Sequence, residues 1–293
     1  MYQDIIYPEI ISGDKNSLIK EAYLFSCRKD VEALKPGNVY LSSPHADTNS
    51  NDYIKSSIHS SEVLFLENFE LGERILESIK LTKKFIKQNT NLGIILVCAP
   101  LIHSLIKYHD HPLKEGLLLT LQNSTKEDTL SICEAINIAN PGGLGKSREY
   151  DTQSLPNVGL VDIMEYSSKY DRISYQYTHS FKDILDFVVP CLNHHQERYK
   201  SLDFSISLTF LEILSKIPDS HIERKFGHKI AKKTSNQAND LLKILVTERI
   251  NQDSFYNQLN NLDYAYKKQG INPGTTADLL VAGLMIKKIF KGT

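Results

Sequence analysis

Apolar residues recur along this chain at the three- and four-residue spacing of helices. One stripe contains Leu18, Ala22, Phe25, Val31 and Leu34. A second stripe contains Leu71, Ile75, Ile79 and Phe85. One-sided stripes of this kind predict amphipathic helices. The same spacing predicts further helices near 52–67, 91–108, 126–139, 159–177, 180–198, 201–216, 226–248, 253–268 and 275–290. Sustained period-two alternation is lacking, so the predicted fold class is all-α.

Polar, glycine and proline residues gather in a few stretches that cannot be helix interiors. These stretches are 35–52, 88–91, 140–157, 218–227 and 270–275. They predict a multi-helix bundle whose active site is built from inter-helix loops and helix N-termini. No Pro/Gly/Ser-rich linker or charge block divides the sequence, so we expect a single domain over 1–293.

The composition fits a globular protein that needs no crosslink. With 293 residues, 41% of them hydrophobic, the chain can bury a full core. Its four cysteines sit singly in apolar stretches rather than in CxxC pairs. This spacing argues against a zinc site and a disulfide framework, and indicates reduced, buried thiols.

The charge balance excludes two classes of partner. The 34 Lys and Arg residues are matched by 35 Asp and Glu residues, which gives a formal net charge of -1. Such a balance favours binding neither to nucleic acid nor to a membrane. The most apolar run, 92–106, is shorter than the ~20 residues of a membrane span, and the N-terminus lacks a secretory pattern. We therefore expect a cytoplasmic protein.

The first candidate segment begins with Lys35, Gly37 and Asn38 and continues to His45 and Asp47. Gly37 allows a sharp turn, and His45 and Asp47 face the same direction if that piece is extended. The residue types predict a phosphate-binding lysine near a His/Asp pair. A capped helix end followed by a solvated polar loop is the alternative.

The second segment contains Asn89, Thr90 and Gly93 and opens the most apolar helix. Hydrogen-bonding side chains and free N–H groups at such a start form a natural anion site. Plain N-capping explains one of these residues.

The third segment contains Gly143, Lys146 and Asp151. Glycines allow a ligand to approach the backbone, and Lys146 supplies a charge for phosphate, but the spacing is not that of a Walker A loop. A generic flexible loop is the alternative.

The fourth segment contains Asp219, Arg224 and Lys225. Asp219 can cap a helix, and the two cations can reach a triphosphate from a helix end. Solvated charges on an exposed turn are the alternative.

The fifth segment contains Asn272, Gly274, Thr276 and Asp278. A tight turn leads into the final apolar helix, where the helix dipole favours a carboxylate at Asp278. That account is entirely structural, yet an Asp at a helix start beside glycine amides can equally bind Mg²⁺ on a nucleotide.

Taken in this order, the segments resemble the triphosphoribosyl-dephospho-CoA synthase family. The likeness runs from 32–39 (EALKPGNV) to 272–280 (NPGTTADLL), through Asn-Thr-x-x-Gly and an Asp followed eight residues later by Gly. The resemblance implies an all-helical cytoplasmic enzyme that joins ATP to the 2'-hydroxyl of 3'-dephospho-CoA. The transferred group is 5-triphosphoribosyl, and adenine leaves.

Two departures distinguish the chain from citrate-lyase-type members. Leu92 stands where they carry a lysine before the glycine, and 142–151 (GGLGKSREYD) replaces Gly-Ala-Arg-x-Glu-Ala. The second pattern is more similar to an archaeal and methylotroph branch, which leaves the identity of the acceptor open.

The family chemistry suggests roles for the candidate residues. We hypothesise that Asp47 or Asp278 assists the acceptor hydroxyl or binds Mg²⁺, and that His45 contacts the base or a phosphate. Lys35, Lys146 and Lys225 would surround the triphosphate. The alternatives are ribosyl transfer to another acceptor and a non-catalytic nucleotide-binding protein. A homodimer fits a helical bundle with exposed apolar faces, although the sequence shows no diagnostic seam.

Overall fold

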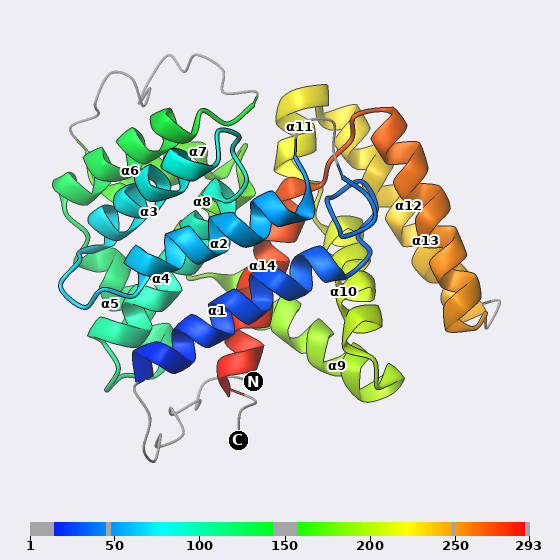
Figure 1. The fold of residues 1–293 in the computed structure, drawn as a ribbon, viewed down its shortest axis with the longest axis horizontal. Helices are drawn as coiled ribbons and strands as arrows, with labels where there is room; N and C mark the ends of the chain where they lie inside the picture. Colours follow the sequence, from blue (N-terminus) through cyan, green and yellow to red (C-terminus); the bar gives the residue numbers. More distant parts are fainter. Residues whose placement is uncertain (1–14, 45–47, 143–157, 248–249, 291–293) are drawn as a thin grey trace.

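The computed structural model describes residues 15–44, 48–142, 158–247 and 250–290, and these form a helical bundle (Figure 1). Within these residues no β-strand forms, and the one β-type pairing is an isolated bridge between Tyr40 and Ser43. The all-α prediction is therefore confirmed.

The first half of the chain contains six helices among its described residues. They are α1 (Lys15–Glu32), α2 (Ser50–Leu64), α3 (Leu71–Phe85), α4 (Leu92–Lys107), α5 (Leu113–Gln122) and α6 (Lys126–Ala139). The second half contains α7 (Leu160–Ser168), α8 (Arg172–Thr178), the π-helical turn η2 (Ile184–Val188), α9 (Val189–Tyr199), α10 (Leu202–Lys216), α11 (Ser220–Phe226), α12 (His228–Thr247), α13 (Gln252–Lys268) and α14 (Gly274–Phe290).

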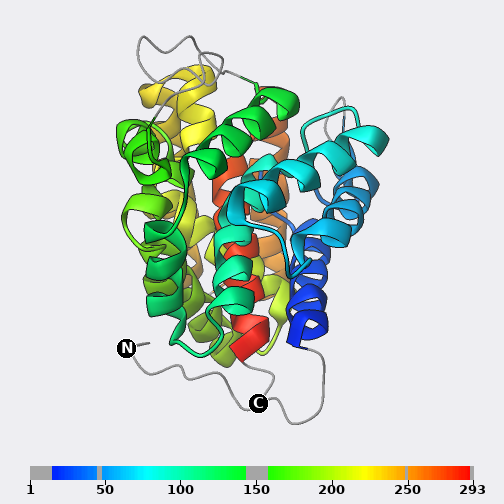
Figure 2. The ribbon, with the colours of Figure 1, turned by 90° about the vertical axis from the view of Figure 1, so that its left-hand side faces the viewer.

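Helix α14 is the centre of the bundle. It contacts α1 and α4 on one side and α9 and α10 on the other, and both views show it enclosed by its neighbours (Figures 1 and 2). Twelve of its 17 residues are buried, so it is apolar around most of its circumference. A helix of this composition is stable only inside a core. Several neighbouring segments consequently meet at the first turn of α14.

Helix α4 is the second core helix. Thirteen of its 16 residues are buried, and it packs against α14, α3 and α5. The start of α4 meets the start of α14, because Gly93 lies directly against Asp278. Two predicted candidate segments thus come together through the packing of the two most apolar helices.

The structure differs from the predicted helices in three places. Segment 159–177 is two helices rather than one, because the Asp171 carboxylate accepts from Ile173 N at 2.8 Å and Ser174 N at 3.1 Å and starts a new helix. Stretch 218–227 was predicted to be irregular but contains α11, capped by Asp219 and ended by Gly227. Helix α5 was not predicted. Each of these helices is too short to show a full apolar stripe.

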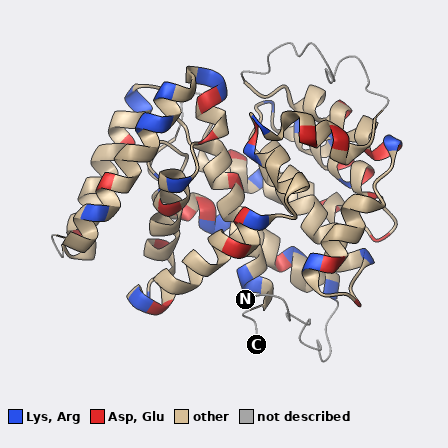
Figure 3. Cartoon of the chain, turned by 180° about the vertical axis from the view of Figure 1, so that it is seen from behind, with Lys and Arg blue, Asp and Glu red and all other residues tan. Residues whose placement is uncertain are grey.

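The surface carries both signs of charge. Basic and acidic residues are interspersed over the face shown in Figure 3, in keeping with the net charge of -1. The four cysteines are unpaired, as predicted, and all but Cys191 are buried. Among the described helices, none is long and apolar enough to cross a membrane.

Candidate active site

Four of the five predicted segments have described residues that lie around the first turn of α14. We call this group the α14 cluster. Its members are Asp30, Lys35, Gly37, Asn38, Gly93, Asp171, Asp219, His221, Arg224, Asn272, Gly274, Thr276 and Asp278. They come from the end of α1 and the loop after it, and from the starts of α4, α8, α11 and α14.

The Asp219 carboxylate joins α11 to α14. Its Oδ1 accepts from the Ile222 amide at 3.0 Å, and its Oδ2 accepts from the Thr276 amide and the Thr276 hydroxyl, both at 2.7 Å. Asp219 is only 1% exposed. Burial raises its pKa, whereas the hydrogen bonds from Thr276 and Ile222 act in the opposite direction. The predicted N-cap therefore also fixes a second helix start.

The loop after α1 is attached to the turn that precedes α14. Asn38 Nδ2 donates to Asn272 Oδ1 at 2.9 Å, and the Gly37 amide donates to Asp263 Oδ1 at 2.8 Å. Gly37 has a φ of +81°, and a Cβ there would lie 2.7 Å from the Ile271 carbonyl oxygen. Both facts require glycine at this position.

Lys35 is fully buried and engaged by the protein itself. Its Nζ lies 3.0 Å from Asp30 Oδ1 and donates to Asn38 Oδ1 at 2.6 Å and to the Val39 carbonyl at 3.3 Å. Burial lowers the pKa of Lys35 and raises the pKa of Asp30, and each partner opposes the shift of the other. The sequence predicted that Lys35 contacts phosphate. In this arrangement the Lys35 ammonium group is instead engaged by Asp30, Asn38 and Val39.

The Asp278 carboxylate, unlike the Lys35 ammonium group, is not engaged by other described side chains. Its carboxylate lies so close to Gly93 that a Cβ at position 93 would overlap it, yet it has no hydrogen-bond partner in the described parts of the chain. Burial raises the pKa of Asp278 well above the ordinary value of 3.8, and the charges of Asp219, Asp30 and Asp171 raise it further, while Arg224 lowers it. A carboxyl group of this kind is available to accept a proton at higher pH than an exposed one.

Arg224 and Lys225 differ in their surroundings. Arg224 Nη1 lies 3.0 Å from Asp171 Oδ2, and its Nε donates to the Gly142 carbonyl at 3.4 Å. Lys225 lies over the Phe226 ring, 5.3 Å from its centroid, on the exposed side of α11. Only Arg224 is therefore fixed beside the cluster.

At the start of α4, Asn89 and Thr90 have structural partners. Asn89 Oδ1 accepts from the Leu92 amide at 3.2 Å and so satisfies one free N–H group at the start of α4, whose N-cap is Asn91, and the Thr90 hydroxyl lies 2.5 Å from that of Ser56. Asn89 is exposed, whereas Thr90 is buried. These contacts agree with the capping alternative and leave Gly93 as the member of this segment that touches Asp278.

The remaining predicted site residues are His45, Asp47, Gly143, Lys146 and Asp151, and they lie outside the described residues. Across the described ranges, no group of three or more His, Cys, Asp or Glu side chains is arranged to hold a metal ion.

Sequence reasoning missed Asp30, Asp171, Asp263 and His221. Asp30 had a detectable signal, since it is a charged residue on the same helix face as the buried Tyr23, Cys27 and Val31. Asp263 is likewise a charged residue at a buried position of its helix. The other two are recognised only from contacts between distant segments.

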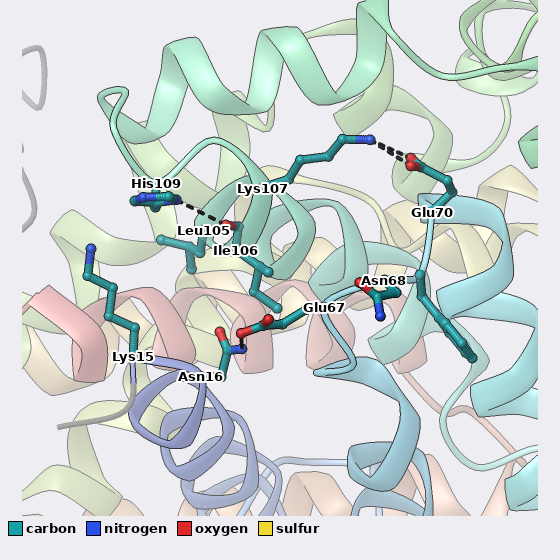
Figure 4. A pocket seen from close by; sticks show the side chains of 10 residues that line it. Lys15, Asn16, Glu67, Asn68, Glu70, Leu105, Ile106, Lys107 and His109 are labelled. Carbon is teal, nitrogen blue, oxygen red and sulfur yellow. Dashed lines mark hydrogen bonds and ion pairs between the residues drawn. The ribbon is translucent and has the colours of Figure 1, made fainter.

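A cavity of about 660 Å³ lies at the opposite end of α4 from the α14 cluster (Figure 4). Its lining includes Glu67, Glu70, Lys107 and His109, and Lys107 forms an ion pair with Glu70. None of the predicted site residues lines it. The predicted site residues and this cavity therefore lie in different parts of the fold.

Comparison with known proteins identifies a family and a related fold. The family model CitG, ATP:dephospho-CoA triphosphoribosyl transferase, matches residues 16–293. A crystal structure of a proposed triphosphoribosyl-dephospho-CoA synthase from Archaeoglobus fulgidus is similar, with a TM-score of 0.64 and 21% identity over 83% of this chain and 98% of that one. At this identity the structural likeness shows a shared fold. The search of curated proteins found no match.

The buried Lys35–Asp30 pair makes a prediction about stability. Lys35→Met leaves the Asp30 carboxylate buried without its cation, so we expect the free energy of unfolding to fall by about 3–5 kcal/mol. Adding Asp30→Leu should restore most of this loss. Lys243→Met, which breaks an exposed pair with Asp240, should cost under about 1 kcal/mol. Urea denaturation measures all three, and equal losses for Lys35→Met and Lys243→Met would contradict the assignment.

The contact between Gly93 and Asp278 makes a prediction about catalysis. The new methyl group of Gly93→Ala must displace the carboxylate, so we expect the turnover rate to fall about 100-fold. Gly283→Ala is the matched control, because its Cβ would overlap Val188 farther along α14, away from the cluster. Both variants should lose stability through crowding, but only Gly93→Ala should lose turnover per folded molecule. Equal turnover in the two variants would show that the position of Asp278 is unimportant.

Proposed function

This chain belongs to the ATP:dephospho-CoA triphosphoribosyl transferase family, and we propose that the reaction takes place at the α14 cluster. The enzyme transfers the triphosphoribosyl group of ATP to dephospho-CoA. One observation carries the placement. The Asp278 carboxylate lacks a hydrogen-bond partner in the described structure, although it lies where the starts of α4 and α14 meet.

The reaction exchanges one bond at the anomeric carbon of ATP. An acceptor hydroxyl, which we assign as the 2'-hydroxyl of dephospho-CoA, forms a bond to ribose C1'. The bond from C1' to adenine N9 breaks, and its electron pair goes to the base. The hydroxyl proton passes to a general base, and the departing adenine gains a proton from solvent. The protein must therefore supply a base for the hydroxyl and stabilise charge on the sugar and the purine.

We assign Asp278 as the base that receives the hydroxyl proton. A general base works best when its pKa lies close to the operating pH, and burial beside Asp219 and Asp30 moves the pKa of Asp278 in that direction. A carboxylate also stabilises positive charge that develops on the ribose. Asp47, which the sequence suggested for the same step, and His45, which it suggested as a contact of the base or a phosphate, remain part of the proposal.

The triphosphate remains on the transferred ribose and must be held during the reaction. We propose that Arg224 contacts it. Among the described residues of the cluster, this cation lies beside Asp171 and the Gly142 carbonyl. Helix starts supply further N–H donors for phosphate oxygens. Lys146 and Lys225 are proposed to complete the positive surroundings. In this proposal Lys35 holds Asp30 and the loop at Asn38, and does not bind phosphate itself.

We further propose that Mg²⁺ accompanies ATP. This ion is usually bound through substrate phosphates, waters and one or two carboxylates, so it does not need a cage of protein ligands. With Asp278 acting as the base, Asp47 is proposed as the carboxylate that binds the ion; the alternative is the reverse assignment, with Asp278 at Mg²⁺ and Asp47 as the base. The ion would neutralise phosphate charge.

Two broader features also belong to the proposal. The four unpaired cysteines support a reducing compartment such as the cytoplasm. A homodimer is also proposed, as for other helical bundles with exposed apolar side chains. Light scattering on the purified protein tests the oligomeric state.

The first prediction of this proposal concerns the products. Purified protein incubated with ATP, Mg²⁺ and 3'-dephospho-CoA should release free adenine in equal amount to the triphosphoribosylated acceptor, as measured by chromatography. Omitting the acceptor should abolish most adenine release. Formation of ADP or AMP in place of adenine would instead indicate phosphoryl or adenylyl transfer and would contradict the proposed reaction.

The second prediction is that Asp278→Asn lowers the turnover rate but raises the thermal stability of the protein. Asn cannot accept the proton, so we expect turnover to fall by about 10²–10⁴-fold. Because folding raises the pKa of Asp278, ionising this group costs stability as pH rises above 3.8 toward the folded-state pKa. The Asn variant should therefore melt at a higher temperature than the wild type at neutral pH, and this difference should vanish below pH 3.8.

Asp219→Asn is the matched control for the stability measurement. Asp219 is also a buried carboxylate, but it accepts three hydrogen bonds from Ile222 and Thr276, and an amide cannot accept all of them. This variant should lose about 1–3 kcal/mol of stability. If Asp278→Asn destabilised the protein to the same extent, Asp278 would be a structural residue like Asp219.

A further inference from the structure

We infer that His221 is a catalytic residue that donates a hydrogen bond to the adenine ring as its bond to ribose breaks. This inference rests on the proposed function and adds the group that recognises and stabilises the leaving base. His221 lies within the fourth candidate segment, but no role was assigned to it above.

The position of His221 is fixed by the link between α11 and α14. It is the second residue of α11 and follows both Asp219, which binds Thr276, and Ser220, whose hydroxyl lies 3.0 Å from that of Thr275. Its imidazole packs over Gly274, because a Cβ at position 274 would lie 2.7 Å from Nδ1 of the ring. The ring therefore lies at the turn that opens α14, one helical turn before Asp278.

The imidazole nitrogens of His221 are free to bind a ligand. No residue of the described chain forms a hydrogen bond with either nitrogen, and the side chain is half-buried rather than enclosed. Other histidines differ. His103 and His195 are buried in the protein interior, and His228 pairs with Glu223 at 3.1 Å. A half-buried polar ring without a partner in the described chain, at the point where the starts of α11 and α14 meet, is best explained by a ligand.

Burial and the neighbouring charges keep His221 neutral. Burial, together with the charges of Arg224 and Lys225, lowers the pKa of His221 to about 4, and Asp171 acts in the opposite direction. At neutral pH the ring therefore carries a single N–H donor, and it does not compete with the phosphates as a cation. Asp171 and Arg224 also influence the Asp278 carboxyl, so the two candidate residues share the same charged neighbours.

A neutral N–H donor suits the leaving base. When the C1'–N9 bond breaks, its electron pair spreads onto the purine, whose N3 and N7 are hydrogen-bond acceptors. A fixed donor at either atom stabilises the developing negative charge without transferring its own proton. His221 thus keeps its proton throughout, and adenine takes its proton from solvent after leaving.

The test compares three substrates with the wild type and His221→Phe. The substrates are ATP, 7-deaza-ATP and 3-deaza-ATP, each with Mg²⁺ and 3'-dephospho-CoA, and the measurement is the rate of base release. With ATP, His221→Phe should lower kcat about 100-fold, the usual effect of removing one donor to a transition state. The wild type should discriminate strongly against the analogue that lacks the bonded nitrogen, and His221→Phe should lose most of that discrimination. Intrinsic differences between leaving groups cancel in this ratio.

Two further variants separate catalysis from folding. His221→Gln keeps an amide N–H and should recover part of the rate, together with part of the discrimination. Gly274→Ala pushes the ring aside without removing it and should reduce discrimination while circular dichroism stays helical.

The inference is overturned if His221→Phe discriminates among the three substrates as the wild type does, or if it keeps the wild-type rate. These outcomes are distinct from failure of the proposed function. If the wild type releases no adenine from ATP and 3'-dephospho-CoA, the reaction itself is wrong. If it does release adenine but discrimination is unaffected by His221, only the role of this residue is wrong.

Discussion

The hydrogen bonds from Thr276 to Asp219 are the constraint on which the arrangement of the site depends. One buried carboxylate caps α11 and also holds the first turn of α14, so two helix starts share a single acceptor group. Because α14 is buried on most sides, its first turn cannot move independently of the core. This fixed turn carries Asp278 toward Gly93 and places Gly274 under His221.

The cluster combines carboxylates whose roles are set by their partners. Asp219 has three hydrogen bonds, Asp30 has the Lys35 cation, and Asp171 has Arg224, whereas Asp278 has no such partner in the described structure. The first three are stabilised in the fold, and their negative charges raise the pKa of the fourth. Functional sites commonly contain a group that the fold alone would not favour. Here that group is adjacent to the helix starts where the family's substrate is proposed to bind.

Much of this arrangement could be predicted from the sequence. The apolar spacing of α14 and α4 identified both helices, and the polar turns at Lys35, Asp219 and Asn272 marked segments that the structure brings together. Convergence at one point could not be predicted, because it depends on how helices pack rather than on spacing within a segment. Lys35 illustrates the limit. Its sequence context suggested a phosphate ligand, but Asp30, five residues earlier near the end of α1, pairs with its charge inside the fold. His221 was missed because its significance comes from Gly274, which is remote in sequence.

The central claim is that the starts of α4, α11 and α14 form the nucleotide site. The most direct measurement is a crystal structure with Mg²⁺ and a non-reactive ATP analogue. The account predicts that ribose C1' lies beside the Asp278 carboxylate and that the purine contacts His221. A nucleotide bound in the cavity near Lys107 and Glu70, at the other end of α4, would contradict it.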